Sequence, residues 1–192
     1  MSKSRLEAFS DGVIAILITI LVLELKVPHG ADWAALSPLL PTALTYVLSF
    51  VYLGIYWNNH HHMLQLTERI DGRILWANLH LLFWLSLVPF ATGWLGQNEF
   101  APLPTALYGT TLFFAGFAYD LLQRAIIAHQ GPGSPLRSAI GADWKGRLSN
   151  LLNAVAIPLA FVARWVSLGV YVGIALLWLV PDRRIERRVQ HR

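Results

Sequence analysis

Ionisable and hydroxyl side chains open the first apolar segment of the chain. It begins Arg5-Leu-Glu-Ala-Phe9-Ser10-Asp11-Gly12 and continues as a long apolar run. A carboxylate about one turn inside such a run is costly without a partner, so Asp11 is a candidate for a polar lock or for proton handling. Ser10 or Asp11 could also cap the N-terminus of a helix, and capping is compatible with a functional role.

The same segment, projected as a helix at about 100° per residue, has two faces. Thr19 lies on one flank of an apolar stripe and Glu24 on the other, whereas Ser10 and Asp11 point away from it. We expect the Ser10/Asp11 face to lock into its own helix bundle. The stripe then either lines a surface that several copies share, or it faces lipid or the core. Periodicity alone does not distinguish these alternatives. Residues within roughly 40° of Ile16 form the stripe: Arg5, Phe9, Gly12, Ile20, Leu23 and Val27.

The composition favours a membrane protein over a soluble domain. The 192 residues are 55% hydrophobic and 14% charged, whereas soluble domains are about 45–50% apolar and about 25% charged. Mean hydropathy is +0.49, and 8 Trp, 6 Tyr and 9 Phe provide aromatic anchors for membrane interfaces. We therefore expect neither disorder nor nucleic-acid binding. The absence of Cys excludes disulfides and thiol chemistry.

Apolar runs long enough to cross about 30 Å of hydrocarbon predict an all-α integral membrane protein with six transmembrane helices in one domain, residues 1–192. The last apolar block, Leu148 to Val180, is too long for one helix, and Arg164-Trp165 offers a break. The predicted spans are 6–27, 38–60, 73–95, 104–128, 148–163 and 167–181.

The basic residues predict the orientation. With both termini cytoplasmic, only Lys26 and Arg164 of the 15 Lys and Arg residues lie on the outer side, as the positive-inside rule requires. A five-span topology would put the basic run Arg183 to Arg188 outside. The first segment lacks a small-residue cleavage pattern, so we expect it to stay in the mature protein. The expected location is a prokaryotic plasma membrane.

Three segments together carry a resemblance to a known family. They are Arg5-x-x-x-Phe9-Ser10-Asp11 with the apolar helix after it, Trp57-Asn-Asn-His-His, and Val88-Pro-Phe. In these segments the chain strongly resembles the transmembrane-protein-175 family of potassium channels, as a prokaryotic member. The resemblance implies a potassium-selective channel: a homotetramer of six-helix subunits whose first helices surround a central pore.

The resemblance also implies which residues line the pore. Ile16 corresponds to the constriction, Ile20 and Leu23 continue the apolar ring, and Thr19 supplies a nearby hydroxyl layer. No Thr-Val-Gly-Tyr-Gly filter occurs in the sequence. A closed Ile16 ring would exclude water, so gating must widen it. Glu24, near Asp32 and Glu99, either concentrates cations at the outer mouth or is a solvated surface acid.

Polar residues of the third span are expected to support the motif. Trp76, His80 and Trp84 share one helix face, with Asn78 on another. His80 or Asn78 is placed to reach the Ser10/Asp11 face, although a buried His80 bonded to a local carbonyl is the alternative. Since the family ties its motif to other helices by polar contacts, the resemblance implies a partner for Asp11 among His80, Asn78 and Arg5.

Other functions have weaker support. A proton-coupled secondary transporter using Asp11 and His80 is the main alternative, although its helices are usually broken, and a non-conducting scaffold is another. Ser10, His80 and Asp11 do not form a hydrolase triad, because adjacent Ser and Asp project differently. We therefore expect no enzyme.

The remaining polar groups suggest no further chemistry. His60, His61 and His62 point about 100° apart on a helix and cannot converge on a metal. Asp120 and Arg124 are spaced for an intrahelical ion pair. We expect neither metal nor cofactor. The expected partners are potassium ions, the lipid bilayer and further copies of the chain.

Overall fold

The computed structural model describes residues 2–141 and 143–179, and every regular element in these ranges is helical. This confirms the all-α prediction. In chain order the elements are α1 (Lys3–Leu21), the 3-10 turn η1 (Val22–Glu24), α2 (Trp33–Leu36), the 3-10 turn η2 (Ser37–Leu39), α3 (Leu40–Gln65), α4 (Gly72–Ser86), α5 (Val88–Gln97), α6 (Pro102–Gln130), α7 (Pro135–Ile140) and α8 (Trp144–Leu179).

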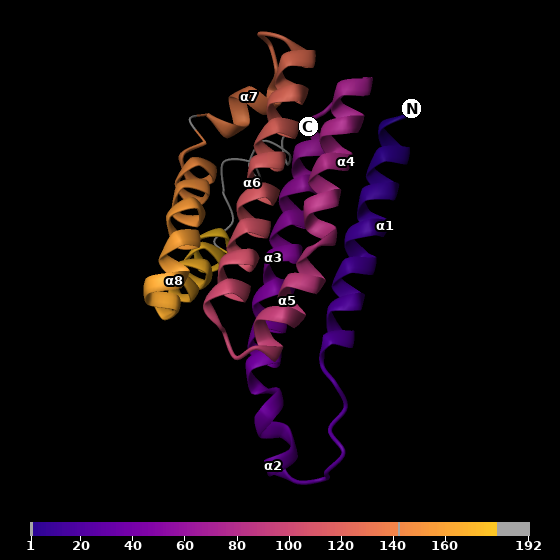
Figure 1. Cartoon of the computed structure of the whole chain (residues 1–192). Coiled ribbons are helices and arrows are strands. Elements are labelled where there is room, and N and C mark those ends of the chain that lie inside the picture. Colours follow the sequence, from indigo (N-terminus) through magenta and orange to yellow (C-terminus); the bar gives the residue numbers. More distant parts are fainter. Residues whose placement is uncertain (1, 142, 180–192) are drawn as a thin grey trace.

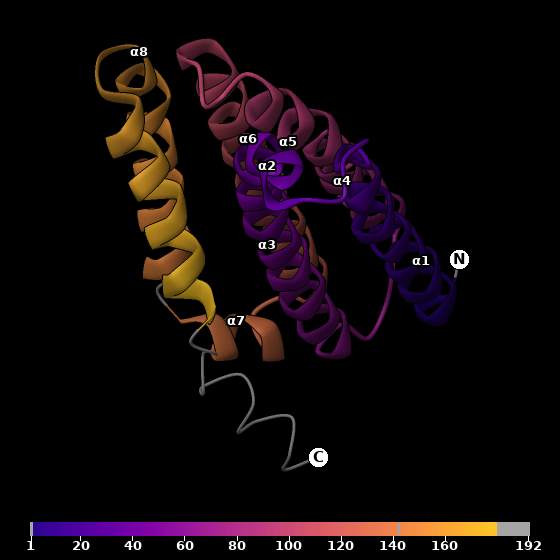
Figure 2. The ribbon, with the colours of Figure 1, turned by 90° about the horizontal axis from the view of Figure 1, so that it is seen from below.

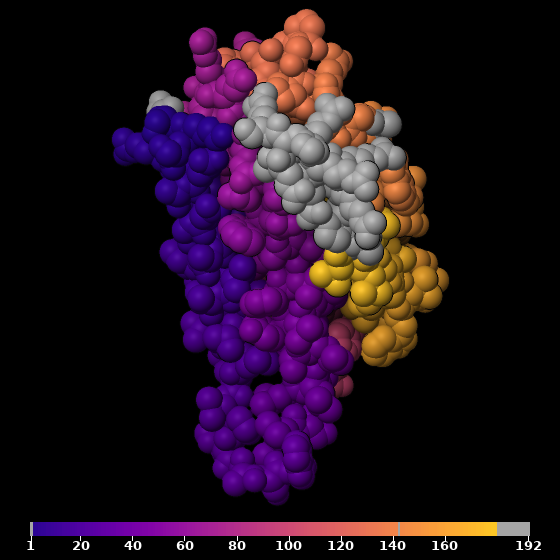
Figure 3. Space-filling model, turned by 180° about the vertical axis from the view of Figure 1, so that it is seen from behind, coloured from indigo at the N-terminus to yellow at the C-terminus, as the bar shows by residue number. Residues whose placement is uncertain are grey.

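The long helices run side by side in a bundle with α1 and α8 at opposite edges (Figures 1 and 2). α1 packs against α3, α4 and α5, whereas α8 packs against α6 and α3. The connection between α1 and α3 extends beyond the other helices (Figure 3). Phe9, Ile16 and Ile20 of α1 are exposed, so the described residues leave one side of α1 uncovered.

Five helical stretches of the described residues are long and apolar enough to cross a membrane. They are Lys3–Glu24, Trp33–Gln65, Gly72–Gln97, Pro102–Gln130 and Trp144–Leu179. The protein is thus a multi-pass membrane protein.

The last stretch folds back on itself. As a straight helix its 36 residues would extend about 54 Å, well beyond the hydrocarbon thickness. It bends at Ala163, whose backbone is not helical (φ −146°, ψ 67°). The two arms, 144–162 and 164–179, lie side by side (Figure 2). Ser167 Oγ donates to the carbonyl oxygen of Ala156 at 2.8 Å, and Trp178 Nε1 donates to Ser149 Oγ at 2.9 Å.

Some helix ends differ from the sequence prediction. The first helix ends at Glu24, so Val27, expected on its apolar stripe, lies beyond it and is 85% exposed. The extended backbone of Leu25 and then Pro28 stop the helix. The third predicted span is divided between α4 and α5, with Pro89 in the first turn of α5. The last two residues of the sixth predicted span, and the basic run after them, lie outside the described residues.

Polar contacts join the helix ends at the end of the bundle where α1 begins. Lys3 Nζ donates to the carbonyl oxygen of Gln65 at 3.1 Å, and Gln130 Nε2 donates to that of Leu66 at 2.7 Å. Asp71 caps α4 by accepting from the Ile74 amide at 2.9 Å, and His129 Nδ1 lies 3.3 Å from its other oxygen. The Ile74 amide and then the neighbouring charges of His129 and Arg73 lower the pKa of the Asp71 carboxyl.

Candidate functional site

α1 presents two different faces, as the helical projection predicted. Its buried residues recur every three or four positions and pack into the bundle core: Leu6, Ser10, Ile14, Leu17 and Leu21. On the other side Ile16 is 58% exposed, and Phe9, Ile20 and Leu23 are exposed with it. Within one copy, no element of the described part of the chain covers this apolar stripe. The side toward the bundle therefore fixes the direction in which the stripe points.

Ser10 joins α1 to two other helices through a buried hydrogen-bond relay. Asn78 Nδ2 on α4 donates to Ser10 Oγ at 2.9 Å, and His60 Nε2 on α3 lies 2.7 Å from Asn78 Oδ1. Ser10 and Asn78 are both 0% exposed. Because the amide nitrogen of Asn78 is already a donor, its oxygen accepts and His60 Nε2 carries the proton. Of the two residues expected to reach this face, Asn78 does so.

The partner of Asp11 differs from the predicted one. Trp57 Nε1 on α3 donates to Asp11 Oδ1 at 3.1 Å, so the expectation of His80, Asn78 or Arg5 was wrong. The Trp57 ring also stacks on His61, with ring centroids 6.1 Å apart. The sequence analysis missed Trp57 and His60 as partners. Both belong to the Trp57-Asn-Asn-His-His segment. Its run of polar residues could have indicated that it contacts the motif.

His80 and Trp76 do not take part in these contacts. His80 Nε2 accepts from Trp84 Nε1, one turn later on the same helix face, at 2.9 Å. Trp76 is 74% exposed, so its expected role in supporting the motif was wrong. α4 turns its Asn78 face toward α1, as the hydrogen bond from Asn78 to Ser10 shows. The residues that α4 buries are Ile74, Asn78, Leu81, Leu82 and Leu85.

Thr19 is exposed beside the stripe, one turn after Ile16. Its Oγ1 donates to the carbonyl oxygen of Ile16 at 2.8 Å. With the hydroxyl proton engaged by the backbone, the remaining lone pairs of the oxygen are free to accept. Thr19 can therefore offer an oxygen ligand to a cation on the exposed side of α1.

Glu24 lies at the far end of the same helix, half-buried against α5. A Cβ atom on Gly93 would overlap the Glu24 carboxylate. The absence of a side chain at Gly93 thus leaves room for this carboxylate. Arg5 is exposed at the opposite end of α1. Arg5 on the stripe and Glu24 on its flank are consequently separated by most of the length of the helix.

Two further sequence expectations are tested by contacts outside α1. Asp120 Oδ2 and Arg124 form the predicted intrahelical ion pair at 2.7 Å. His60, His61 and His62 contact polar or aromatic neighbours: besides the His60 relay, His61 Nε2 lies 2.8 Å from Gln65 Nε2, and the rings of His61 and His62 meet edge to face.

Comparison with known proteins identifies the family. Residues 5–89 match the family described as endosomal/lysosomal potassium channel TMEM175. Potassium channel HX13_20290 of Chryseobacterium sp. is 51% identical over 190 residues, covering 99% of both chains. The chain belongs to the TMEM175 family.

The fold of this TMEM175 family member is shared with a solved structure. The crystal structure of a lysosomal potassium-selective channel TMEM175 homolog from Chamaesiphon minutus superposes with a TM-score of 0.82 at 29% identity, covering 93% of this chain and 96% of that one. The endosomal/lysosomal proton channel TMEM175 of Gallus gallus is 35% identical over 103 residues, 47% of this chain and 21% of its own length.

The matched region of this TMEM175 family member includes the contacts described above. Residues 5–89 contain α3, α4 and all but the first two residues of α1. They therefore include both the Ser10–Asn78–His60 relay and the Asp11–Trp57 hydrogen bond. The relay and the indole bond together leave the opposite, apolar side of α1 exposed. That side can face lipid, or it can meet other copies of the chain around a shared axis.

Proposed function

We propose that the protein is a potassium-selective channel and that four copies surround a pore lined by α1. The observation that carries the proposal is the two-faced structure of α1, with successive polar residues bound into the bundle and an exposed apolar stripe opposite. Relatives matching nearly the whole chain are named potassium channels, which supports cation conduction over a scaffold.

The constriction in this proposal is a ring of Ile16 side chains, with Ile20 and Leu23 continuing it toward the Glu24 end. A ring of apolar side chains excludes water when narrow, and a partly dehydrated cation then meets a steep barrier. Gating therefore requires that the ring widen. A gate of this kind does not need the rings of backbone carbonyl oxygens that a Thr-Val-Gly-Tyr-Gly filter provides.

Selectivity in this proposal comes from dehydration. Potassium sheds water more easily than sodium, so an apolar constriction favours potassium. The Thr19 hydroxyls donate hydrogen bonds to the Ile16 carbonyl oxygens. The hydroxyl oxygens then replace part of the hydration that the cation loses. Glu24, at the outer end, raises the local cation concentration; its half-buried position against Gly93 keeps it at that end of the pore.

The proposed location is a prokaryotic plasma membrane with both termini cytoplasmic. In the described residues, Lys3, Arg5, Arg73 and Arg124 lie toward the end of the bundle where α1 begins, whereas Arg164 lies at the bend of α8, at the opposite end. This distribution agrees with the positive-inside rule.

Proton conduction is the second candidate, because the animal relatives are named proton channels. A proton-coupled transporter built on Asp11 and His80 has less support. Asp11 accepts from Trp57 on α3, while His80 accepts from Trp84 on its own helix. The two residues are therefore engaged by different indoles rather than paired.

The test is a flux assay on the purified protein in liposomes, under separate potassium, sodium and proton gradients. We expect gradient-driven potassium flux exceeding sodium flux in wild type, and higher leak with weaker selectivity in Ile16→Asn. Leu79→Asn is the matched control, because Leu79 is an exposed apolar residue on α4. Unchanged flux in Ile16→Asn would remove Ile16 from the pore. Flux that requires a proton gradient would indicate a transporter, and proton flux without potassium flux a proton channel.

A further inference from the structure

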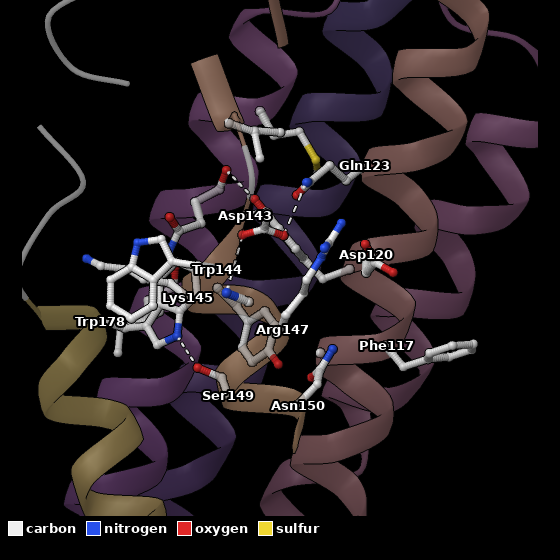
Figure 4. A pocket seen from close by; sticks show the side chains of 18 of the residues that line it. Phe117, Asp120, Gln123, Asp143, Trp144, Lys145, Arg147, Ser149, Asn150 and Trp178 are labelled. Atoms are coloured by element: carbon white, nitrogen blue, oxygen red, sulfur yellow. Dashed lines mark hydrogen bonds between the residues drawn. The ribbon is translucent and has the colours of Figure 1, made fainter. Parts of the chain in front are cut away.

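A cavity lies away from α1, at the end of the bundle that contains α7. It has a volume of about 360 Å³ between α3, α6, α7 and α8 (Figure 4), within the range of about 300–1,000 Å³ that is common for small-ligand sites. Among its described lining residues none belongs to α1. An occupant of this cavity would therefore lie outside the proposed pore.

The cavity begins at the level where the membrane-crossing stretches end. Its lining includes Leu66, which directly follows the stretch Trp33–Gln65, and Trp144, the first residue of Trp144–Leu179. Tyr52 also lines it, 14 residues before Leu66 along α3 and thus about 21 Å further into the membrane. One end of the cavity is therefore at the height of lipid headgroups, and the other end is within the hydrocarbon.

Bases outnumber acids at the headgroup end. The charged lining residues are Asp120, Arg124, Asp143, Lys145 and Arg147, which are three bases and two acids. Those at the start of α8 lie opposite Asp120 and Gln123 of α6 (Figure 4). Arg137 on the adjoining α7 is exposed and adds a further positive charge. Basic pockets between membrane helices are typical sites for acidic lipid headgroups.

Both acids of the cavity already have partners within the chain. Asp143 accepts from Gln123 Nε2 at 3.4 Å and from the Gly146 amide at 3.3 Å. Asp120 Oδ2 is ion-paired with Arg124 at 2.7 Å. The acids therefore need no cation from outside the chain.

The arginines keep donors that can still bind an anion. The Arg124 side chain is 68% exposed, and an exposed ion pair contributes little to stability. Its guanidinium has five N–H donors, more than one carboxylate engages. Arg147 is exposed, and no carboxylate of the described residues lies within 4.0 Å of it. Burial raises the pKa of the Asp143 carboxyl, whereas the Arg147 charge lowers it, so Arg147 acts on Asp143 without a direct ion pair.

The walls beyond these charges are largely apolar or aromatic. They include Ile55 of α3, Phe117 of α6 and Ile174 of α8. Phe117 and Arg147 are both exposed, so the cavity is open at the surface between α6 and α8, two helices that cross the membrane. An apolar chain can enter there from the bilayer. A small soluble anion would leave these walls without contact.

One face of α8 places amides between the charges and the deeper part of the cavity. Arg147, Asn150 and Asn153 follow each other at intervals of three residues, and all line the cavity. Gly116 of α6 leaves room for Asn150, because a Cβ atom on Gly116 would overlap the Asn150 amide. Asn153 is 4% exposed, and its Oδ1 atom has no hydrogen-bond partner among the described residues. It lies about 9 Å beyond Arg147 along the helix.

We propose that this cavity binds an anionic phospholipid, with the phosphate beside Arg147 and one acyl chain between α3, α6 and α8. The excess of bases favours a phosphate that carries no cation of its own, and the same bases repel the choline of a zwitterionic lipid. The amides of Asn150 and Asn153 offer donors and acceptors to the ester region below the phosphate and to water beside it. This site does not depend on the proposed channel function.

The test is native mass spectrometry of the full chain in a non-ionic detergent, titrated with palmitoyl-oleoyl phosphatidylglycerol. We expect saturable binding of one such lipid per chain, about tenfold or more tighter than binding of the matched phosphatidylcholine, because charge-assisted hydrogen bonds to the phosphate are not offset by a repelled cation. Glycerol 3-phosphate, which has the phosphate but no acyl chain, should not bind saturably. Binding of glycerol 3-phosphate as tight as that of the lipid would assign the cavity to a soluble anion and overturn the proposal.

Arg147→Gln should weaken phosphatidylglycerol binding about tenfold, since a hydrogen bond to a charged group is lost. Arg147→Lys keeps the charge and should retain most of the binding. Arg69→Gln is the matched control, because Arg69 is an exposed base between α3 and α4, outside the cavity lining. Thermal unfolding without added lipid should be alike in all three variants, because both arginines are exposed.

Three results would contradict this site. Equal weakening by Arg147→Gln and Arg69→Gln would show that the lipid is attracted by the basic end of the bundle as a whole. Equal affinity for phosphatidylglycerol and phosphatidylcholine would show that the charge of the cavity selects nothing. Loss of binding in Ile16→Asn would place the lipid on the exposed stripe of α1, whereas the proposal requires that this variant bind as wild type does.

Discussion

The indole of Trp57 on α3 donates a hydrogen bond to the carboxylate of Asp11 on α1, across 3.1 Å. The preceding residue of α1, Ser10, accepts from Asn78 on α4. Adjacent helix residues point about 100° apart, so these two bonds hold α1 against two different helices. Together they restrict rotation of α1 about its axis, and the direction of the Ile16 stripe follows from them.

Removing the indole donor while keeping an aromatic ring should loosen this arrangement. Trp57→Phe is expected to lower the free energy of unfolding by about 1–3 kcal/mol, because Asp11 loses a hydrogen bond to a charged group. Denaturation with increasing SDS in mixed micelles measures it. Trp33→Phe serves as control, since Trp33 is exposed in α2. Equal effects of the two substitutions would show that the Asp11 contact contributes nothing specific.

Removing the central residue of the buried relay, Asn78, should lower the free energy of unfolding more than removing the end residue Ser10. Asn78→Leu leaves both Ser10 and His60 without their partner, whereas Ser10→Ala removes only one bond. We expect a loss of about 1–3 kcal/mol for Ser10→Ala and a larger one for Asn78→Leu. The double variant should be less destabilised than the sum of the two. Additive losses would indicate that the residues act independently. Ser86→Ala is the control and should leave the free energy of unfolding almost unchanged, because the exposed Ser86 hydroxyl bonds only to a nearby carbonyl of its own helix.

The Thr19 hydroxyl should affect ion preference more than leak. Thr19→Val keeps the shape of the side chain but removes its oxygen, so the potassium-over-sodium permeability ratio is expected to fall severalfold. Thr19→Ser keeps the oxygen and should preserve the ratio. Reversal potentials in planar bilayers under bi-ionic conditions measure it. A ratio that is the same in Thr19→Val and wild type would exclude the hydroxyl from selectivity.

Acid stability should depend on Asp71. Its folded pKa lies below its usual value, so its contribution is full above the unfolded value of about 4 and is lost as pH falls through the folded one. Asp71→Asn should therefore show a smaller loss of thermal stability between about pH 5 and pH 3 than wild type does. Parallel pH profiles for the two proteins would contradict this assignment.

Periodicity and length were enough to predict the helices and the two faces of α1. An apolar run must be helical to satisfy its backbone in lipid, so the all-α class followed from hydropathy alone. The break near Arg164 followed from length, because one helix of that size exceeds the bilayer. The ends of the helices were harder to predict. The helical backbone of α1 and η1 ends at Glu24, where Leu25 is extended and Pro28 follows, and apolar composition does not report such a local feature.

Only the tertiary structure decided which side chains meet. The sequence offered His80, Asn78 and Arg5 as partners for Asp11, all of suitable chemistry, and Trp57 was chosen by the relative placement of α1 and α3. The rotation of α4 likewise turned Asn78 toward Ser10 and left Trp76 exposed. The cavity that Asp143 and Asn153 line likewise depends on the packing of α8 beside α3 and α6. Such contacts join residues far apart in sequence, and helix packing, which local patterns do not encode, sets them.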